Sequence, residues 1–201
     1  MHTGAREAPI HPYIYDPDGR LASVGAGGAT TTFGYDPASE LTTTARPDGT
    51  TETRTWDPAG RLAEVKDTSG PTVLQDFAYT YDSAGNPTQV ATPAETDTYI
   101  YDLSDRLTSA CYGASCAQGS IAYTYNKVGN RLTQATPAGT TTYTYDAADE
   151  LTQAAGPSGA TAYTWDKAGR VLTAGATVYS WDGAGRLASR DRTRRDGPGR
   201  A

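Results

Sequence analysis

The side chains of this sequence that could do chemistry are a recurring Asp, two cysteines and two histidines. Nucleophilic catalysis needs a Ser or Cys beside a base that a third group orients. Both histidines, His2 and His11, lie within the first 12 residues, and no nucleophile, base and orienting group recur together. We therefore expect a protein that is not an enzyme, with no catalytic residue and no cofactor.

The recurring Asp invites comparison with a calcium site or a carboxylate pair. Its clearest copy, Asp16-Pro17-Asp18-Gly19, lacks the spaced oxygen ligands of an EF-hand loop. The glycine-aspartate nonapeptide of calcium-binding β-helices does not occur either. A single Asp at the same place in successive turns is what turn capping requires. We expect a structural Asp and no metal site.

The cysteines, Cys111 and Cys116, lie close together in the segment CYGASC. With no nearby His and no second Cys pair, they would make a poor zinc site. A small-loop disulfide and two free thiols both stay open.

Composition and charge exclude several classes of protein. The chain carries 23 acidic and 17 basic residues, which disfavours nucleic acid as a partner because that affinity comes largely from Lys and Arg. It contains 14 Tyr, 3 Trp and 22 Gly, residues of strands and tight turns, so a helical bundle is excluded. No apolar run approaches the roughly 18 residues of a membrane-spanning helix. The opening MHTGAREAPIHP has no signal-peptide core, so export would depend on a larger system.

The elements that position these residues follow from a repeat, aromatic-x-aromatic-Asp-x-x-Gly-Arg-Leu, which occurs nine times with a period near 20 residues. Of its 18 aromatic slots, 17 hold an aromatic residue and Arg54 is the exception. Only Phe77 and Tyr112 are aromatic outside these slots. The copies are YIYDPDGRL, FGYDPASEL, RTWDPAGRL, YTYDSAGNP, YIYDLSDRL, YTYNKVGNRL, YTYDAADEL, YTWDKAGRVL and YSWDGAGRL.

Each piece of the motif has a place in a β-hairpin. Alternate residues of a strand share a face, so the two rings of each copy should lie side by side and build a stacked aromatic ladder. Asp-Pro-x-Gly predicts a type I turn whose Gly accepts positive φ. Ser39, Asp105 and Asp149 replace that Gly, and Ser39 should give the loosest turn because Asp tolerates the left-handed region better. Consecutive hairpins should add side by side into one long, curved antiparallel sheet.

The predicted structural motif comprises the slot residues with their Asp, Gly and Arg neighbours. They are Tyr13, Tyr15, Asp16, Gly19, Arg20, Tyr35, Asp36, Trp56, Asp57, Gly60, Arg61, Tyr79, Tyr81, Asp82, Gly85, Tyr99, Tyr101, Asp102, Tyr123, Tyr125, Gly129, Arg131, Tyr143, Tyr145, Asp146, Tyr163, Trp165, Asp166, Gly169, Arg170, Tyr179, Trp181, Asp182, Gly185 and Arg186.

Two sets of these residues admit a second interpretation. The rings could bind sugars, with Trp56, Trp165 and Trp181 as possible glycan contacts, but rings in fixed register are more economically explained by packing. The motif arginines could line a lumen and hold an acidic cargo, whereas pairing with a neighbouring carboxylate is the simpler account. These arginines are Arg20, Arg61, Arg106, Arg131, Arg170 and Arg186.

The segments YDPDGRL, WDPAGRL and WDGAGRL resemble the YD repeat of the Rhs (rearrangement hot spot) proteins, which also occurs in Tc-toxin shell subunits and teneurins. The resemblance implies a β-sheet that spirals into a hollow shell, enclosing a C-terminal toxin in the bacterial members. Nothing after Trp181 resembles the cleavage segment or toxin of that architecture.

We therefore expect an N-terminal tail over residues 1–12, nine repeats over 13–189 and an Arg-rich, disordered tail over 190–201. The expected function is architectural: part of the wall of a secreted or cell-surface shell that holds and helps deliver a toxin, with the other repeats and the toxin domain as partners. A carbohydrate-binding adhesion module and a truncated remnant without a role of its own are the alternatives. Nine hairpins in an open sheet leave two edges, so the isolated chain should be marginally stable and prone to self-association.

Overall fold

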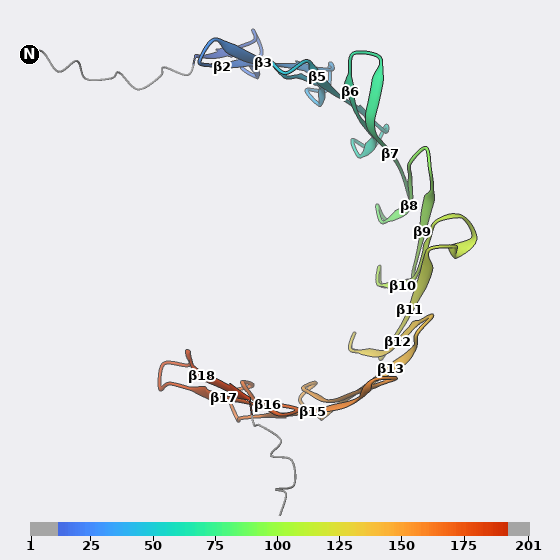
Figure 1. Ribbon diagram of the computed structural model, residues 1–201, viewed down its shortest axis with the longest axis vertical. Helices are drawn as coiled ribbons and strands as arrows, with labels where there is room; N and C mark the ends of the chain where they lie inside the picture. The colour runs from blue at the N-terminus through green and yellow to red at the C-terminus, as the bar shows by residue number, and fades with distance from the viewer. Residues whose placement is uncertain (1–11, 193–201) are drawn as a thin grey trace, which may run out of the picture. The chain divides into compact units, whose positions relative to one another are not determined.

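The computed structural model describes residues 12–192. In this range the chain folds into strands with one short 3-10 helix, η1 (Figure 1). The elements are β1 (Tyr13–Tyr15), β2 (Leu21–Ala26), β3 (Ala29–Tyr35), β4 (Leu41–Ala45), β5 (Thr50–Trp56), β6 (Leu62–Ser69), β7 (Thr72–Tyr81), β8 (Pro87–Ala91), β9 (Thr96–Tyr101), β10 (Leu107–Tyr112), η1 (Ala114–Cys116), β11 (Gly119–Tyr125), β12 (Arg131–Thr136), β13 (Gly139–Tyr145), β14 (Leu151–Gly156), β15 (Gly159–Trp165), β16 (Val171–Ala174), β17 (Thr177–Trp181) and β18 (Leu187–Arg192).

Antiparallel pairing joins each strand to the next one along the chain. The residue registers run in this way from β1 to β9 and from β11 to β18. Together the 18 strands form one open sheet. The predicted fold class, all-β with tandem antiparallel hairpins, is confirmed.

The chain divides into two compact units, Met1–Tyr99 with Tyr112–Ser115 and Ile100–Cys111 with Cys116–Ala201. In the first unit, β1 to β8 form four hairpins. In the second, β11 to β18 form four more. The same two-strand repeat therefore builds both units.

Each motif turn closes with the predicted bond. The backbone N–H three residues after the motif Asp donates to the Asp carbonyl, as Gly19 does to Asp16 at 2.9 Å. The residue at that position has positive φ in every copy, including Ser39 at 67°, Asp105 at 57° and Asp149 at 62°. A register shift lies beside the turn: Tyr15 of β1 pairs with Leu21 and Ile14 with Ser23, so the return strand β2 carries one extra residue, Ala22.

The sequence predicts the loosest turn at Ser39, but the length of its closing bond does not set this turn apart. Its turn bond to Asp36 is 3.1 Å long, compared with 3.0 Å at Asp105 and 3.2 Å at Asp149. Its hydroxyl also accepts a hydrogen bond from Arg20 Nη1 at 3.1 Å. This contact comes from the preceding repeat and supplies support that the turn sequence alone does not reveal.

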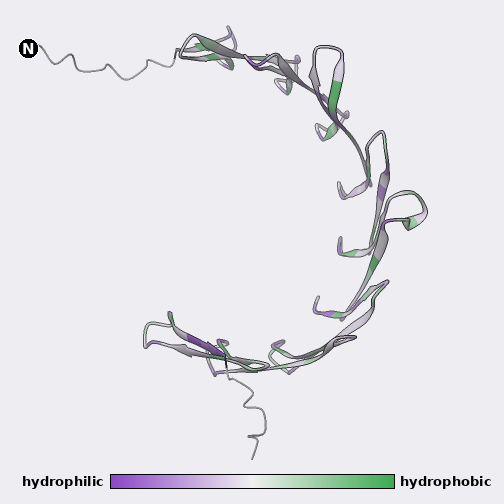
Figure 2. Ribbon diagram, viewed as in Figure 1, coloured by the Kyte–Doolittle hydropathy of each residue, from purple (hydrophilic) through white to green (hydrophobic). Residues whose placement is uncertain are grey.

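The two faces of the sheet differ in exposure. In β13, residues 139, 141, 143 and 145 are half-buried and the residues between them are exposed. Figure 2 shows short hydrophobic and hydrophilic stretches scattered along strands that are mostly of intermediate hydropathy. The exposed face carries cross-strand hydroxyl pairs, such as Thr124–Thr133 at 2.7 Å and Thr144–Thr152 at 2.9 Å.

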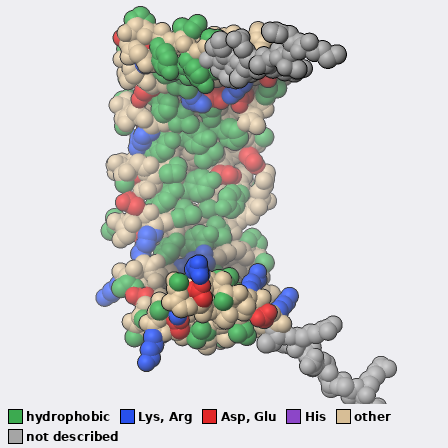
Figure 3. Space-filling view, turned by 90° about the vertical axis from the view of Figure 1, so that its left-hand side faces the viewer, with side chains coloured by type: hydrophobic (Ala, Val, Ile, Leu, Met, Phe, Trp, Pro, Cys, Tyr) green, Lys and Arg blue, Asp and Glu red, His purple; other side chains and the backbone are tan. Residues whose placement is uncertain are grey.

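A single layer of strands buries few side chains completely. Of the described residues, Ala110 is the only buried hydrophobic one, and Thr44 and Glu52 are buried polar ones. On the face shown in Figure 3, hydrophobic side chains gather in the middle, and Lys, Arg, Asp and Glu lie mainly toward its borders. Stability must therefore come from contacts between neighbouring strands and repeats.

The predicted boundaries shift slightly at the C-terminal side. Strand β18 continues to Arg192 and pairs Arg190 with Tyr179, so residues 190–192 belong to the last hairpin and not to a tail. Residues 1–11 and 193–201, which include most of both predicted tails, lie outside the described residues.

Candidate functional site: the contact between repeats

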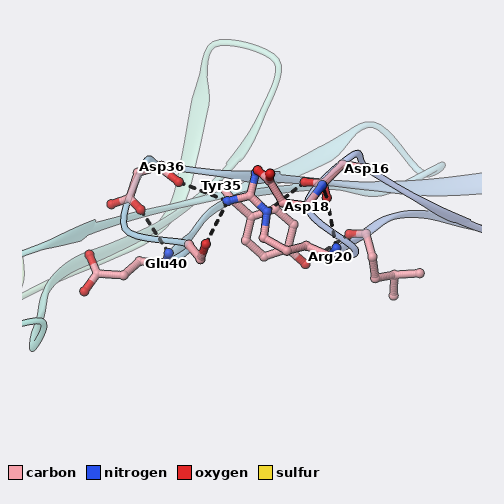
Figure 4. Close-up of polar contacts among 8 residues, drawn as sticks. Asp16, Asp18, Arg20, Tyr35, Asp36 and Glu40 are labelled. Carbon is pink, nitrogen blue, oxygen red and sulfur yellow. Dashed lines mark hydrogen bonds and ion pairs between the residues drawn. The ribbon is translucent and has the colours of Figure 1, made fainter.

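The motif Asp organises its own turn through both carboxylate oxygens. Asp16 Oδ1 accepts from the backbone N–H groups of Asp18 at 3.0 Å and Arg20 at 2.9 Å, and Oδ2 accepts from Arg20 Nε at 2.7 Å (Figure 4). The full pattern recurs around four further carboxylates, namely Asp57, Asp102, Asp166 and Asp182.

These contacts perturb the carboxylates electrostatically. The backbone N–H and then the guanidinium of Arg61 donate to Asp57, and they hold the pKa of that carboxyl below its usual value. In Asp102 the guanidinium of Arg106 is the largest cause of the same shift. The predicted pairing of motif arginines with a neighbouring carboxylate is confirmed at Arg20, Arg61, Arg106, Arg170 and Arg186.

The guanidinium that binds its own Asp also reaches the next repeat. Arg20 Nη1 donates to the carbonyl of Asp36 at 3.1 Å, and the guanidinium carbon lies 4.7 Å from the centroid of the Tyr35 ring. Two other repeats have the same arrangement. In them, Arg61 contacts Tyr81 and the Asp82 carbonyl, and Arg106 contacts Tyr125 and the Asn126 carbonyl.

The second aromatic slot returns a hydrogen bond to the preceding repeat. Its hydroxyl or indole N–H donates to the carbonyl of the residue that opens the preceding return strand, as Tyr35 does to Leu21 at 3.0 Å. The distances lie between 2.7 and 3.1 Å in Tyr35–Leu21, Trp56–Leu41, Tyr81–Leu62, Tyr125–Leu107, Tyr145–Arg131, Trp165–Leu151 and Trp181–Val171.

We call this unit the inter-repeat clamp: the motif Asp, the motif Arg, and the second-slot ring of the following repeat. Tyr123 and Tyr125, the two slot residues of one copy, lie side by side as predicted, with ring centroids 6.4 Å apart and planes tilted by 38°. The sequence did not predict that slot rings also lie beneath arginines, as Tyr35 does beneath Arg20, or that their polar atoms meet carbonyls of the preceding repeat.

This arrangement bears on the three tryptophans considered as glycan contacts. Trp56, Trp165 and Trp181 are half-buried, and each donates its indole N–H to a carbonyl of the preceding repeat. Their rings thus have an intramolecular role that accounts for their place in the motif.

One predicted motif residue has a different place. Arg131 pairs in register with Tyr125, which is the position of Leu21 opposite Tyr15, so Asn130 and not Arg131 stands at the motif Arg position. The guanidinium of Arg131 instead lies over the first-slot rings, 4.4 Å from Tyr143 and 5.6 Å from Tyr123.

Two repeats carry Glu at the motif Arg position. These residues are Glu40 and Glu150, and in both cases the second aromatic slot of the following repeat holds Trp. Burial raises the pKa of each carboxyl above its usual value, and the neighbouring carboxylates, Asp36 for Glu40 and Asp146 for Glu150, raise it further. The two contacts between these repeats and the following ones therefore keep the hydrogen bond from the tryptophan indole N–H but lack the motif arginine.

Sequence reasoning missed an ion cluster in the first unit. Glu52, which is buried, accepts from Arg46 Nη2 at 2.8 Å and forms an ion pair with Arg54. Arg46 also pairs with Asp67 at 3.3 Å. The sequence signal for this cluster was Arg54, which places a cation in an aromatic slot. Arg54 lies two residues after Glu52, so the two side chains share one face of β5.

The open question of the cysteines is settled in favour of a disulfide. Cys111 and Cys116 are bonded across the segment that contains η1. In the same segment the backbone N–H of Gly113 donates to Asp97 Oδ1 at 2.8 Å. The disulfide therefore closes a short connection between β10 and β11.

Within residues 12–192 no group of three or more His, Cys, Asp and Glu side chains could hold a metal ion. His2 and His11 lie outside the described residues. In the described part of the chain no helix is long and apolar enough to cross a membrane.

Comparison with known families defines the class of protein to which this repeated sheet belongs. The profile described as RHS Repeat matches residues 15–51 and 56–97, and that of the Teneurin YD-shell matches residues 95–196. The chain belongs to the RHS and YD-shell repeat family, as its motif indicated. No curated protein sequence matches it.

Solved structures with a similar fold include Tc toxin components. The chain aligns over 94% of its length with the Tc holotoxin pore of Photorhabdus luminescens, with 19% identity and a TM-score of 0.56. It aligns over 94% with TcdB2-TccC3-Cdc42, with 20% identity and a TM-score of 0.53. It aligns over 96% with TcdB2-TccC3-TEV, with 20% identity and a TM-score of 0.54. The alignments span only 11%, 11% and 12% of those chains, respectively.

Proposed function

We propose that this chain is a wall segment of an Rhs-type shell that encloses a polymorphic toxin and helps to deliver it. The observation that carries the proposal is the inter-repeat clamp. It uses polar contacts to hold one hairpin to the next, as Arg20, Arg61 and Arg106 do, which is what a thin wall needs when it has almost no closed core. The partners would be the other repeats of a larger shell and an enclosed toxin domain.

Family membership and the fold shared with Tc toxin components support this role. The place of action would be outside the producing cell or at its surface, as part of the larger system. The mechanism is mechanical enclosure, and the motif residues serve it by holding the hairpins in register.

The experiment is protease protection of the toxin in the native assembly purified from the producing cell. We expect the toxin to resist digestion in the wild-type assembly. Combined Arg61→Glu and Arg106→Glu substitutions break two clamps and should make the toxin digestible, without changing the activity of the released toxin. Lys127→Glu reverses an exposed charge in a turn outside the clamp and serves as the control.

Two results would contradict the proposal. One is equal digestion of the toxin in the wild-type assembly and in the double variant. The other is a native complex that holds no toxin at all.

A further inference from the structure

The disulfide between Cys111 and Cys116 lies in a segment that is additional to the repeat. The turn residues Asp102 and Asn126 on either side of it are further apart than the usual period of about 20 residues. The bonded cysteines themselves are five residues apart, and the connection between β10 and β11 runs between them. The bond therefore closes a local ring and does not join distant parts of the sheet.

The backbone of this segment has an uncommon conformation. Ser115 and Cys116 have positive φ, at 53° and 59°. In the described part of the chain, the other non-glycine residues with positive φ are Ser39, Asp105 and Asp149, and each of them closes a motif turn. Left-handed backbone costs free energy in residues other than Gly and persists only where other contacts impose it. The disulfide imposes it here, because it fixes Cys116 directly.

Contacts that do not involve the cysteines hold the strands on either side of the segment. Arg106 binds Asp102 in the turn before β10 and donates to the carbonyl of Asn126 in the turn after β11. The hydroxyl of Tyr125, at the end of β11, donates to the carbonyl of Leu107, at the start of β10, at 2.8 Å. The two strands are also neighbours in the sheet. Breaking the disulfide should thus release the segment and leave the strands paired.

The two cysteines differ in the exposure of their neighbours. Cys111 follows Ala110, which is 1% exposed. Cys116 is half-buried and stands between Ser115 and Ala117, which are both exposed. A thiol in solution should therefore approach Cys116 more readily than Cys111.

We infer that the Cys111–Cys116 pair is a site of reversible thiol–disulfide exchange with a dithiol, and that its redox state decides whether the segment between β10 and β11 is closed or open. One thiolate of the dithiol forms a bond to Cys116 Sγ, the bond between the cysteines breaks, and its electron pair goes to Cys111 Sγ. The second thiolate of the same molecule then attacks the mixed disulfide and releases Cys116. The dithiol is oxidised by two electrons, and its two thiol protons end on the two cysteines.

Opening the segment changes a contact that can be measured. In the closed form Gly113 is buried, and its backbone N–H donates to Asp97 Oδ1 at 2.8 Å. In the open form Ser115 and Cys116 can leave the left-handed region, so Gly113 is no longer held against Asp97. The inference concerns this connection alone, and it applies with or without an enclosed cargo.

The first test equilibrates the full chain with dithiothreitol buffers of graded reduced-to-oxidised ratio and counts thiols by alkylation and mass spectrometry. The wild type should change from a disulfide to two thiols without losing the strand signal in circular dichroism. Ser115→Gly removes the cost of a left-handed Ser, so half reduction should require a ratio that is about fivefold more reducing. Ser120→Gly makes the same change at an exposed residue of β11 and should leave the midpoint unchanged.

The second test measures amide hydrogen exchange of the oxidised and the reduced chain. Exchange in residues 112–118 should be at least about tenfold faster after reduction, whereas exchange in β11 and β12 should not change. A variant that combines Cys111→Ser and Cys116→Ser should exchange like the reduced wild type, with or without dithiothreitol.

Three results would overturn the inference. They are a disulfide that excess dithiothreitol leaves intact in the folded chain, a reduction that unfolds β10 and β11 together with the segment, and equal exchange of residues 112–118 in both redox states. The proposed shell function would survive each of these results, because protection of the toxin tests it separately.

Discussion

Arg61 and Tyr81 belong to consecutive repeats, and the guanidinium carbon of Arg61 lies 4.7 Å from the centroid of the Tyr81 ring. The same guanidinium binds Asp57 in its own turn at 2.7 Å and the carbonyl of Asp82 in the next turn at 2.9 Å. A planar, forked cation can make all three contacts at once, which a lysine ammonium cannot. One side chain therefore couples two hairpins that would each be marginal alone.

Removing this guanidinium should weaken the coupling measurably. We expect Arg61→Ala to lower the free energy of unfolding by about 1–2 kcal/mol, because a half-buried cation–π contact and an inter-repeat hydrogen bond are lost together. Arg186→Ala is the matched control, since the side chain of Arg186 is 81% exposed and has no following repeat among the described residues. Urea unfolding followed by circular dichroism measures both, and equal losses would show that the turn contact alone matters.

The second-slot hydroxyl should contribute separately. Tyr145→Phe removes the 2.9 Å bond to the Arg131 carbonyl and should cost about 0.5–1.5 kcal/mol, because the carbonyl is left without this donor. Tyr163 occupies a first slot in the next repeat, and no hydrogen bond of its hydroxyl is among the described contacts. Tyr163→Phe should therefore change stability by less than about 0.5 kcal/mol. If the two variants unfold at the same urea concentration, the hydroxyl bond adds nothing.

The hairpins could be predicted from the sequence because their determinants are local. Alternating aromatic slots and the Asp-x-x-Gly turn lie within nine residues of one another, and both appear in the structure as expected. The clamp could not be predicted in the same way, because Arg61 and Asp82 are 21 residues apart in the sequence. The residues that Arg61 contacts depend on the register of the strands between residues 61 and 82. That register is a property of the assembled sheet.

The same limit explains the misplacement of Arg131. In the segment NKVGNRL, an Arg precedes a Leu as in the other copies, and alignment by this pair assigns it the motif role. The turn instead counts from Asn126, whose Oδ1 accepts from the backbone N–H of Asn130 at 2.8 Å. Turn geometry therefore overrides the resemblance of the dipeptide.

Acid should unfold the protein through its turn carboxylates. Hydrogen bonds hold the pKa of Asp57, Asp82 and Asp166 below the usual value. For a carboxyl whose pKa is lower in the folded state, the stabilisation is complete above the pKa of the unfolded chain and is lost as the pH falls through the folded value. We expect stability to change little between about pH 7 and 5 and to fall below about pH 4.

Urea unfolding at a series of pH values measures this dependence, and Asp57→Asn provides the control. Asn126 shows that an amide can make the same backbone contacts, since its Oδ1 accepts from Val128 and Asn130. The variant should thus keep the turn, be less stable at pH 7, and lose less stability on acidification. An acid transition identical to that of the wild type would contradict the role of Asp57.

The repeats that carry Glu should respond to pH in the opposite sense. Burial and the charges of Asp146 and Asp166 raise the pKa of Glu150 above its usual value. Such a carboxyl favours the folded state below the pKa of the unfolded chain, and that contribution is lost as the pH rises through the folded value. At neutral pH the ionised Glu150 therefore opposes folding, and Glu150→Gln should unfold a few degrees higher than the wild type at pH 7.

Because protonation removes the charge that the substitution removes, the difference should vanish below about pH 4. Glu40→Gln tests the same reasoning in the first unit, where burial and Asp36 raise the pKa of Glu40. Thermal unfolding at pH 7 and at pH 3.5 would provide the comparison for both variants. A stabilisation of equal size at both pH values would mean that it arises from packing of the amide and not from the carboxylate charge.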